Sequence, residues 1–401
     1  MDKPRALLLE NIHPDAAARL AAAGFAVTRR PDASSEAQLR RLLPGVTLLG
    51  VRSRTQVTAA ALAKADCLLA IGSFCVGTDN VDLDAAAARG AAIFNAPYSN
   101  TRSVAELVIG EVIMLMRRVC DRSRRLHEGV WDKSSAGSRE VRGKTLGIIG
   151  YGNIGGQVGI LAEALGMRVL YHDLVEKLSL GNARRCASLA ELLRQSDVVT
   201  VHVDDRARNA GLIGARELAA MPAGAMIINA SRGKVVDLQS LARALRRGRL
   251  SGAAVDVFPQ EPAADGKGFR SPLQNAPNVI LTPHVGGSTQ EAQSNIAAYV
   301  SDRLNAYLSM GDTFYCVNLP QVHLPVMRDS HRLLHIHRNV PGVMSQISSI
   351  LAAHGINITG QYLETNERVG YAITDIAKKY DKRVLQSLAD IKETIRLRVL
   401  F

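Results

Sequence analysis

Three short segments carry residue types that could move a proton and hold a small anion. They are Asn-Ala-Ser-Arg-Gly around Arg232, Phe-Pro-Gln-Glu-Pro around Glu261 and Thr-Pro-His-Val-Gly-Gly around His284. An arginine binds a carboxylate through two parallel hydrogen bonds. A histidine exchanges protons near neutral pH, and a neighbouring glutamate stabilises its charged form. Each residue alone is more often structural, but together they form an acid–base and anion-binding set.

A glycine-rich segment, Gly150-Tyr-Gly152-Asn-Ile-Gly155, matches the G-x-G-x-x-G pattern of dinucleotide-binding turns. It follows an apolar strand candidate and opens a helix candidate, as the pattern requires. The first glycine permits a tight turn, the second lets the backbone approach a pyrophosphate, and the third lets helix and strand pack closely. Asp173 ends the next strand candidate, where a carboxylate accepts from ribose hydroxyls and repels a 2′-phosphate. The sequence therefore predicts NAD rather than NADP; the alternative is a tight turn without a ligand.

These motifs lie in a region where apolar strand candidates alternate with helical stretches. The six strand candidates are Thr145–Gly150, Arg168–His172, Asp197–His202, Ala225–Ala230, Gly252–Val257 and Val279–Thr282. The alternation predicts a six-stranded, doubly wound, Rossmann-type α/β sheet. Such sheets bind ligands at the carboxyl ends of their strands, where the segments with Arg232, Glu261 and His284 are expected. With a nucleotide beside it, this set suits hydride transfer.

Residues 5–100 contain a second alternation of strands and alanine-rich helices. Its strand candidates are Ala6–Leu9, Leu48–Val51, Cys67–Ile71 and Ala92–Phe94. This order predicts another parallel sheet. A long apolar helix is predicted over Ser103–Arg118, and Ser103 and Glu106 have the spacing of a capping box at its start.

The last part of the chain follows an irregular stretch that we interpret as a linker at residues 319–330. Residues 331–401 then show the order strand, helix, strand, strand, helix, strand. This βαββαβ order is typical of the ferredoxin-like fold. A module of this size is too small for an enzyme core and suits the binding of a small ligand.

Composition excludes several classes of protein. The chain has 401 residues, of which 47% are hydrophobic and 21% charged, so it is neither disordered nor collagen-like. Its net charge is +12, but the basic residues are scattered and no RNA-binding motif accompanies them, so no nucleic-acid partner is expected. The apolar runs are too short for a membrane span or a signal peptide. Five cysteines without a Cys-x-x-Cys pair suit a cytoplasmic protein with reduced thiols and no metal site.

Taken together, the motifs resemble those of the D-isomer-specific 2-hydroxyacid dehydrogenases. The similar segments extend almost from end to end, at residues 51–55, 94–107, 147–155, 229–237, 256–262 and 282–292. The tail from His335 to Val343 resembles the start of an ACT domain. The resemblance implies a discontinuous, flavodoxin-like substrate domain (1–100 and 290–318), an NAD-binding domain (101–289), the linker and an ACT domain (331–401).

The resemblance also assigns roles to single residues. It implies that Arg232 binds the substrate carboxylate and the reacting oxygen, that His284 is the acid–base group and that Glu261 pairs with His284. Besides the three glycines, the implied NAD contacts are Asn153, Ile154, Asp173, Ala230, Ser231, Arg232, Asp256, His284, Val285, Gly286 and Gly287.

Family members that act on 3-phosphoglycerate suggest which cations would meet a phosphate. Arg52 and Arg54 are two residues apart at the exit of a strand, so both point to one face. Lys133 follows Trp131 in a segment that resembles one whose lysine reaches substrate phosphate and whose tryptophan docks on a neighbouring subunit. The alternative for all three cations is an ordinary solvated surface. The resemblance implies oxidation of D-3-phosphoglycerate to 3-phosphohydroxypyruvate, the first step of L-serine biosynthesis, in a cytoplasmic homotetramer.

The ACT-like tail is expected to be regulatory. ACT domains commonly pair across subunits and bind amino acids, which implies L-serine as an effector at His337, Asn339 and Asn357; the alternative is a purely oligomerising domain. Reduction of 2-oxoglutarate is an implied side activity. Three other functions stay open: another small 2-hydroxyacid as substrate, a non-enzymatic NAD-binding scaffold, and an amino-acid-sensing regulator of nucleic acid. The complete Arg232, Glu261 and His284 set weighs against a scaffold.

Overall fold

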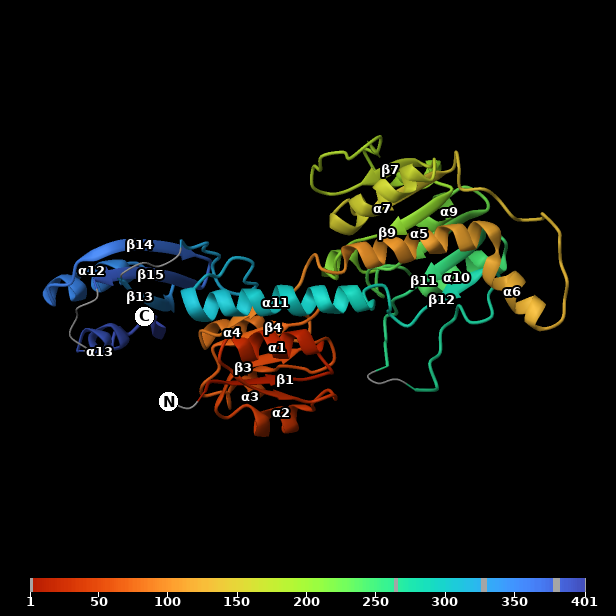
Figure 1. The fold of residues 1–401 in the computed structure, drawn as a ribbon. Helices are drawn as coiled ribbons and strands as arrows, with labels where there is room; N and C mark the ends of the chain where they lie inside the picture. The colour runs from red at the N-terminus through yellow and green to blue at the C-terminus, as the bar shows by residue number, and fades with distance from the viewer. Residues whose placement is uncertain (1–2, 263–265, 326–329, 378–382, 401) are drawn as a thin grey trace. The chain divides into compact units, whose positions relative to one another are not determined.

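The computed structural model describes residues 3–262, 266–325, 330–377 and 383–400. The chain forms two compact units (Figure 1). The first unit contains Met1–Ser99 together with Gln293–Phe401, and the second unit contains Asn100–Ala292. The described helices include none that is long and apolar enough to cross a membrane.

The first unit contains a parallel sheet with the strand order β2-β1-β3-β4-β5. The strands are β1 (Arg5–Leu8), β2 (Ala26–Arg29), β3 (Val46–Val51), β4 (Ala70–Ser73) and β5 (Ala92–Phe94). This order is that of flavodoxin-like folds, as the resemblance implies. Strand β2 is missed by sequence reasoning because most of it is exposed and its alternation is weak.

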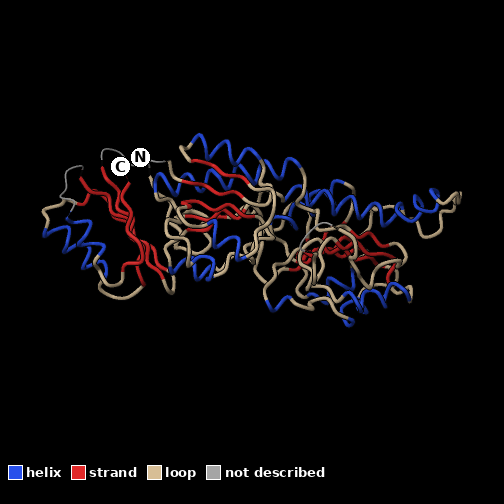
Figure 2. The backbone as a smooth tube through the Cα atoms, turned by 90° about the horizontal axis from the view of Figure 1, so that it is seen from below, coloured by secondary structure: helices blue, strands red, loops and turns tan. Residues whose placement is uncertain are grey.

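Helices cover both faces of this sheet (Figure 2). Successive residues of β1 point to opposite faces. Ala6 and Leu8 therefore join the core with α1 (Pro14–Ala22) and α11 (Gln290–Met310), whereas Leu7 packs with α2 (Glu36–Leu42) and α3 (Ala59–Leu62). Helix α4 (Leu83–Ala88) contributes alanines to both cores.

A second sheet in the first unit is antiparallel, with the order β14-β15-β13-β16. Its elements are β13 (Ser330–Arg338), α12 (Val343–Ala353), β14 (Ile358–Thr365), β15 (Val369–Ala377), α13 (Arg383–Ala389) and β16 (Thr394–Leu400). This succession confirms the predicted ferredoxin-like βαββαβ order. Residues 326–329 of the predicted linker lie outside the described residues.

The two central strands of the antiparallel sheet, β13 and β15, are buried on both faces. Helices α12 and α13 cover one face, where Leu333 and Ala372 contribute to the core. On the other face, Leu334 and Tyr371 share one apolar cluster with Phe94 of β5 and with Tyr307 of α11. The two sheets of the first unit are therefore joined by a common core.

Polar side chains of the antiparallel sheet also cap the end of α11. Arg332, which is fully buried, pairs with Asp375 at 2.7 and 2.8 Å and donates to the carbonyl oxygen of Met310 at 3.0 Å. The Tyr371 hydroxyl donates to the Gly311 carbonyl at 2.7 Å. Arginines suit the last turn of a helix because its unpaired carbonyls carry partial negative charge.

The second unit contains a seven-stranded parallel sheet with the order β12-β11-β10-β9-β6-β7-β8. The strands are β6 (Thr145–Ile149), β7 (Arg168–His172), β8 (Arg184–Arg185), β9 (Val198–Val201), β10 (Ala225–Asn229), β11 (Leu250–Val255) and β12 (Val279–Leu281). The doubly wound, Rossmann-type prediction is confirmed, with one strand more than the six expected. That strand, β8, has two exposed residues and no apolar pattern to reveal it.

Helices pack on both faces of this sheet. Helices α5 (Thr101–Arg117) and α7 (Asn153–Ala164) lie on one face, and α8 (Leu189–Gln195), α9 (Ala215–Ala220) and α10 (Leu238–Arg246) lie on the other. A one-turn 3₁₀ helix, η1, spans Ala207–Asn209, and α6 (Val119–His127) continues from α5 after a kink.

The predicted capping box at the start of α5 is wrong. The helix begins at Thr101, two residues earlier than expected, so Ser103 lies inside the first turn. The Ser103 hydroxyl instead lies 2.8 Å from that of Thr289, and Glu106 pairs with Arg102 at 2.6 Å. The N-cap residue Asn100 makes no side-chain capping bond.

Candidate active site

The glycine-rich turn joins β6 to α7. Gly150 has a φ of 88°, and a Cβ on it would collide with the carbonyl of His202. A Cβ on Gly155 would collide with the carbonyl of Gly150, whereas a Cβ on Gly152 would meet no heavy atom within 4 Å. The first and third glycines therefore serve packing, and Gly152 leaves open space in front of the α7 N-terminus, where amide groups suit phosphate.

Asp173 lies beside this turn at the exit of β7. Its carboxylate accepts from the amide of Tyr151 at 2.9 Å and from that of Val175 at 3.0 Å. These two bonds fix the carboxylate and leave lone pairs for further donors. The space at Gly152 and this fixed acceptor fit the pyrophosphate and ribose of NAD, respectively.

The loop after β10 presents Arg232. The Asn229 side chain accepts from the amide and hydroxyl of Ser231 at 3.1 and 2.8 Å and donates to the Arg232 carbonyl at 3.0 Å. The half-buried Arg232 guanidinium donates to the Ser231 carbonyl at 2.9 Å, which leaves most of its five donors for a ligand.

Gly233 brings the loop after β11 against the Arg232 loop. A Cβ on Gly233 would collide with the backbone of Phe258 and Pro259. The amide of Phe258 in turn donates to Oε1 of Glu261 at 3.1 Å. The charge of Arg232 is close enough to stabilise the Glu261 carboxylate. Two of the sequence-predicted segments thus meet through a contact that only glycine permits.

Glu261 reaches the third segment through its other oxygen. Oε2 lies 2.8 Å from Nδ1 of His284, and the two side chains are 37% and 51% exposed, respectively. His284 has a φ of 55°, unusual for a residue with a side chain. Its amide donates to the Asp256 carbonyl at 2.7 Å, which holds the backbone in that conformation. The structure therefore brings together Arg232, Glu261 and His284.

The pair shifts both titrations toward the ionised forms. The hydrogen bond with Glu261 raises the pKa of His284 above its ordinary value, against the opposing effect of partial burial. Partial burial also acts to raise the pKa of Glu261, but its hydrogen bonds with His284 and the Phe258 amide outweigh that effect and lower it. The pair is suited to take up a proton at Nε2 of His284, the ring nitrogen that Glu261 does not contact.

Asp256 supports the His284 loop from below. Its carboxylate, in a residue that is 2% exposed, accepts from the Thr282 hydroxyl at 2.6 Å and from the amides of Val285 and Gly286 at 2.8 and 2.9 Å. These bonds turn the carboxylate toward residues 282–286. The sequence predicts Asp256 as an NAD contact but does not reveal that it supports the loop. The one signal in the sequence is the hydroxyl of Thr282, two residues before His284, from which Asp256 accepts a hydrogen bond.

Glu111 is a further acid that sequence reasoning missed. It lies in α5, is fully buried, and neither carboxyl oxygen has a hydrogen-bond partner among the described residues. Burial, together with the negative charge of Asp256, raises the pKa of Glu111 to about 8. Glu111 is therefore an uncharged acid at neutral pH, and it lies close enough to Asp256 to feel the charge of that carboxylate.

The predicted phosphate-binding cations lie in both units. Arg52 and Arg54 belong to the first unit and follow β3, with Arg52 half-buried and Arg54 exposed. Lys133 belongs to the second unit, in the exposed segment after α6 that also carries Trp131, whose exposed fraction is 76%.

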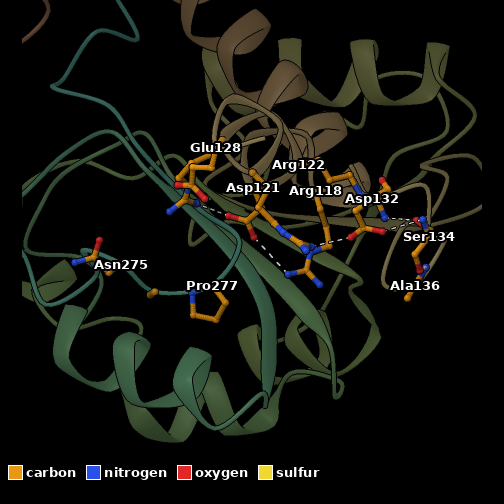
Figure 3. A pocket seen from close by; sticks show the side chains of 12 residues that line it. Arg118, Asp121, Arg122, Glu128, Asp132, Ser134, Ala136, Asn275 and Pro277 are labelled. Carbon is orange, nitrogen blue, oxygen red and sulfur yellow. Dashed lines mark hydrogen bonds and ion pairs between the residues drawn. The ribbon is translucent and has the colours of Figure 1, made fainter. Parts of the chain in front are cut away.

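A cavity of about 390 Å³ lies at the base of the Lys133 segment (Figure 3). Four arginines line it, and three of them pair with aspartates of the same lining. Asp121 pairs with Arg118 at 3.3 Å and with Arg124 at 2.6 Å, and Asp132 pairs with Arg125 at 2.7 Å. The sequence-predicted site residues do not line this cavity.

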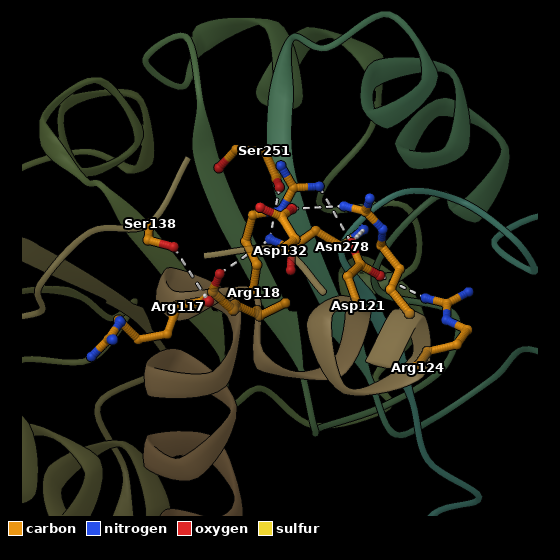
Figure 4. A network of polar contacts seen from close by, with 10 residues as sticks. Arg117, Arg118, Asp121, Arg124, Asp132, Ser138, Ser251 and Asn278 are labelled. Atoms are coloured by element: carbon orange, nitrogen blue, oxygen red, sulfur yellow. Dashed lines mark hydrogen bonds and ion pairs between the residues drawn. The ribbon is translucent and has the colours of Figure 1, made fainter. Parts of the chain in front are cut away.

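The same charges anchor α6 to the sheet of the second unit (Figure 4). Asp121 accepts from the amide of Asn278 at 2.9 Å. The Asn278 side chain donates to the carbonyls of Leu115 and Ser251, at 3.2 and 2.8 Å. Arg118, between α5 and α6, has a left-handed φ of 53°. The network fixes the kink from which the Lys133 segment departs.

The predicted effector residues are not gathered in one place. His337 pairs with Gly370 near one end of β15 and is 2% exposed. Asn339 follows directly and donates to the Asn366 carbonyl at 2.7 Å. Asn357 precedes Ile358, which pairs with Ile376 at the other end of β15, about 20 Å away at the usual rise per residue. A site that uses all three residues therefore needs a second copy of the sheet.

Comparisons with known families match this architecture. Residues 109–286 match the family model described as "D-isomer specific 2-hydroxyacid dehydrogenase, NAD binding domain". Residues 333–396 match the model described as "AHAS small subunit-like ACT domain". The first match spans the glycine turn, Asp173 and the three catalytic candidates.

Curated relatives and solved structures extend the similarity. D-3-phosphoglycerate dehydrogenase of Escherichia coli (strain K12) is 48% identical over 403 residues, which cover 100% of this chain and 98% of the relative. The enzyme of the same name from Dictyostelium discoideum is 46% identical over 400 residues, with coverages of 100% and 98%. The crystal structure of the TT0316 protein from Thermus thermophilus is 32% identical, with a TM-score of 0.69 and coverages of 76% and 96%. D-lactate dehydrogenase from Aquifex aeolicus, complexed with NAD and lactic acid, is 27% identical, with a TM-score of 0.64 and coverages of 76% and 95%.

Proposed function

This chain belongs to the D-isomer-specific 2-hydroxyacid dehydrogenase family, and we propose that within it the enzyme oxidises D-3-phosphoglycerate to 3-phosphohydroxypyruvate. The chain is an NAD-dependent oxidoreductase. The observation that carries the proposal is the His284–Glu261 pair, at 2.8 Å, beside Arg232 in a chain similar over its full length to enzymes that bear this substrate in their name.

Arg232 holds the substrate carboxylate. Its fork of donors matches two carboxylate oxygens, and Asn229 and Gly233 fix the loop that carries it. A substrate whose two carboxylate oxygens are both bound by Arg232 keeps its C2 hydroxyl against His284. This fixed orientation lowers the entropic barrier of the reaction. NAD, when bound, accepts the hydride that leaves C2.

His284 takes the hydroxyl proton. Nδ1 is engaged by Glu261, so Nε2 is the nitrogen that accepts from the substrate. The imidazolium that results is stabilised by the Glu261 carboxylate, whose own lowered pKa keeps it ionised. In the reverse direction the same Nε2 returns the proton to the carbonyl oxygen of the product.

The substrate phosphate is bound by Arg52 and Arg54, with Lys133 as a third cation. Arg52 and Arg54 lie on a loop at the carboxyl end of β3, the edge at which open parallel sheets bind ligands. Three cations suit a group that carries about two negative charges near neutral pH.

The antiparallel sheet is the regulatory part of the enzyme. We infer that two copies pair so that His337 and Asn339 of one face Asn357 of the other, with L-serine bound between them, in a homotetramer. The separation of these residues within one copy supports this arrangement. All five cysteines are free, which suits an enzyme that works in the reducing cytoplasm. We place the enzyme in L-serine biosynthesis and infer reduction of 2-oxoglutarate as a side activity.

The test is NADH formation from D-3-phosphoglycerate at alkaline pH, with and without L-serine, by the full chain. We expect turnover that serine suppresses. His284→Ala should lower turnover by about 10²-fold or more, as expected for loss of an acid–base group. His127→Ala, at an exposed histidine of the same unit, is the matched control. Turnover of another small 2-hydroxyacid in place of 3-phosphoglycerate contradicts the substrate; unaltered turnover by His284→Ala contradicts the mechanism.

A further inference from the structure

The loop that carries Arg52 and Arg54 is held from beneath by one buried carboxylate. Glu10 is 1% exposed, and its oxygens accept from three backbone amides of the loop. The distances are 3.2 Å to the amide of Arg52, 2.9 Å to that of Arg54 and 2.9 Å to that of Thr55. These three amides give both oxygens of the buried carboxylate hydrogen-bond partners.

Glu10 reaches the loop through an unfavourable backbone conformation. It lies two residues after the end of β1 and has a φ of 60°, and the next residue, Asn11, has a φ of 50°. Two successive residues with side chains in the left-handed region are costly, and such outliers persist where the surrounding structure requires them. Here the left-handed turn directs the Glu10 carboxylate under residues 52–55.

Asn80 holds the same loop from its carbonyl side. This residue is 8% exposed, and its side-chain amide donates to the carbonyl of Arg52 at 3.0 Å and to that of Thr55 at 2.7 Å. Glu10 binds the amides of these same residues, so both ends of the loop are fixed by complementary bonds. Glu10 and Asn80 come from different segments of the chain, so each can be replaced without altering the residues beside the other.

This arrangement decides how the loop recognises an anion. The amides of Arg52, Arg54 and Thr55 point to Glu10, so they are not aimed at a ligand. Recognition therefore falls to the guanidinium groups. Nε of Arg54 forms a long ion pair of 3.9 Å with Oε2 of Glu10, and the Arg54 side chain is 41% exposed. We infer that Glu10 and Asn80 are positioning residues that set the direction of Arg52 and Arg54 toward the substrate phosphate, an inference that rests on the proposed function.

The test compares steady-state constants for D-3-phosphoglycerate in the full-length wild type, Glu10→Gln and Asn80→Ala. Glutamine has the size of glutamate, but one carboxylate oxygen becomes an NH₂ group. That group cannot accept from the loop amides that it would face. We expect KM to rise about tenfold in each variant, as for the loss of one or two hydrogen bonds, while kcat stays within about twofold. The dissociation constant of NADH, measured by fluorescence, should not change.

Asp66→Asn is the matched control. The Asp66 carboxylate also accepts from two amides of the first unit, those of Gly45 and Cys67 at 2.8 and 2.9 Å. These amides precede β3 and β4, at the opposite end of the strands from the Arg52 loop. Its KM should equal that of the wild type. If Glu10→Gln fails to fold, as judged by its melting transition, Asn80→Ala decides. An unchanged KM in the folded variants overturns the inference alone; a wild type that binds NADH but does not turn over 3-phosphoglycerate overturns the proposed function and the inference with it.

Discussion

Gly233 and Phe258 are in backbone-to-backbone contact, which leaves no room for a side chain at residue 233. Because Gly233 follows Arg232, and because the Phe258 amide holds Glu261, this contact sets the distance between the anion-binding and acid–base halves of the site. The site thus depends on a residue that has no functional group of its own.

Gly233→Ala should therefore damage catalysis more than its size suggests. The added methyl forces the loops after β10 and β11 apart, and displacements of about 1 Å at a reacting centre cost on the order of 10²-fold in rate. We expect kcat to fall by about that factor. Gly110→Ala is the control, because Gly110 lies in α5, where an added Cβ meets nothing within 4 Å and alanine favours the helix.

The His284–Glu261 pair predicts a pH dependence. In the oxidative direction His284 must be neutral to accept a proton, and Glu261 raises its pKa. The acidic limb of kcat/KM for the wild type should therefore lie above the ordinary pKa of histidine. Glu261→Gln should move that limb to lower pH and reduce kcat about 10- to 100-fold. The readout is the pH profile of NADH formation.

Glu128→Gln, at an exposed acid of the same unit, should leave the profile unchanged. A limb that stays in place in Glu261→Gln means that Glu261 does not control the titration of His284.

Asp173 should determine the choice between NAD and NADP. In Asp173→Ser, the repulsion of a 2′-phosphate is lost together with an acceptor for ribose hydroxyls. The ratio of kcat/KM for NADP to that for NAD should rise at least about tenfold, equivalent to about 1.4 kcal/mol. Asp197→Asn is a suitable control, since Asp197 also accepts a backbone amide, that of Thr145 at 2.9 Å, but at the start of β6. An unaltered ratio in Asp173→Ser would show that the carboxylate acts only on the turn.

Glu111 should make the stability of the protein fall as pH rises. Its pKa is about 8 in the folded protein and near 4.5 in the unfolded chain, so between these values the unfolded state has lost a proton that the folded state retains. Folding is then weakened by up to about 1.4 kcal/mol per pH unit across this window. Glu111→Gln cannot ionise and should lack this dependence.

The measurement is the melting temperature of both proteins from pH 5 to pH 8, where the difference should grow in favour of the variant. Glu106→Gln, at an exposed glutamate of the same helix, should follow the wild type. A constant difference between Glu111→Gln and wild type contradicts a raised pKa.

The sequence predicts those elements whose apolar pattern is strong. All six strands expected in the second unit are present, because each contains a run of apolar residues. The strands missed, β2 and β8, are largely exposed and gain their place from neighbours rather than from their own pattern. The predicted start of α5 is wrong because the Ser103 hydroxyl contacts Thr289 instead of capping the helix, and a contact so far along the chain is invisible in a local pattern.

For the site, the sequence predicts the functional residues well, but it does not predict the contacts that hold them in place. The glycine turn, Asp173 and the Arg232, Glu261 and His284 segments are motifs with fixed local spacing, and the structure brings the last three together. The support given by Asp256 and Glu10 depends on burial and on bonds between segments far apart in the chain. Such bonds leave no periodic signal, so they become visible only in three dimensions.

The common core of the two sheets in the first unit has a consequence for biosynthesis on the ribosome. Arg396 of the last strand bonds the carbonyl of Leu68, 328 residues earlier, and Tyr371 packs with Phe94. The second unit is one continuous segment, so it is free to fold while translation continues. The first unit has to wait, with the apolar surface around Phe94 uncovered, until its closing strands emerge. Nascent chains of this protein therefore have most need of chaperones during the interval between the synthesis of β5 and that of β16.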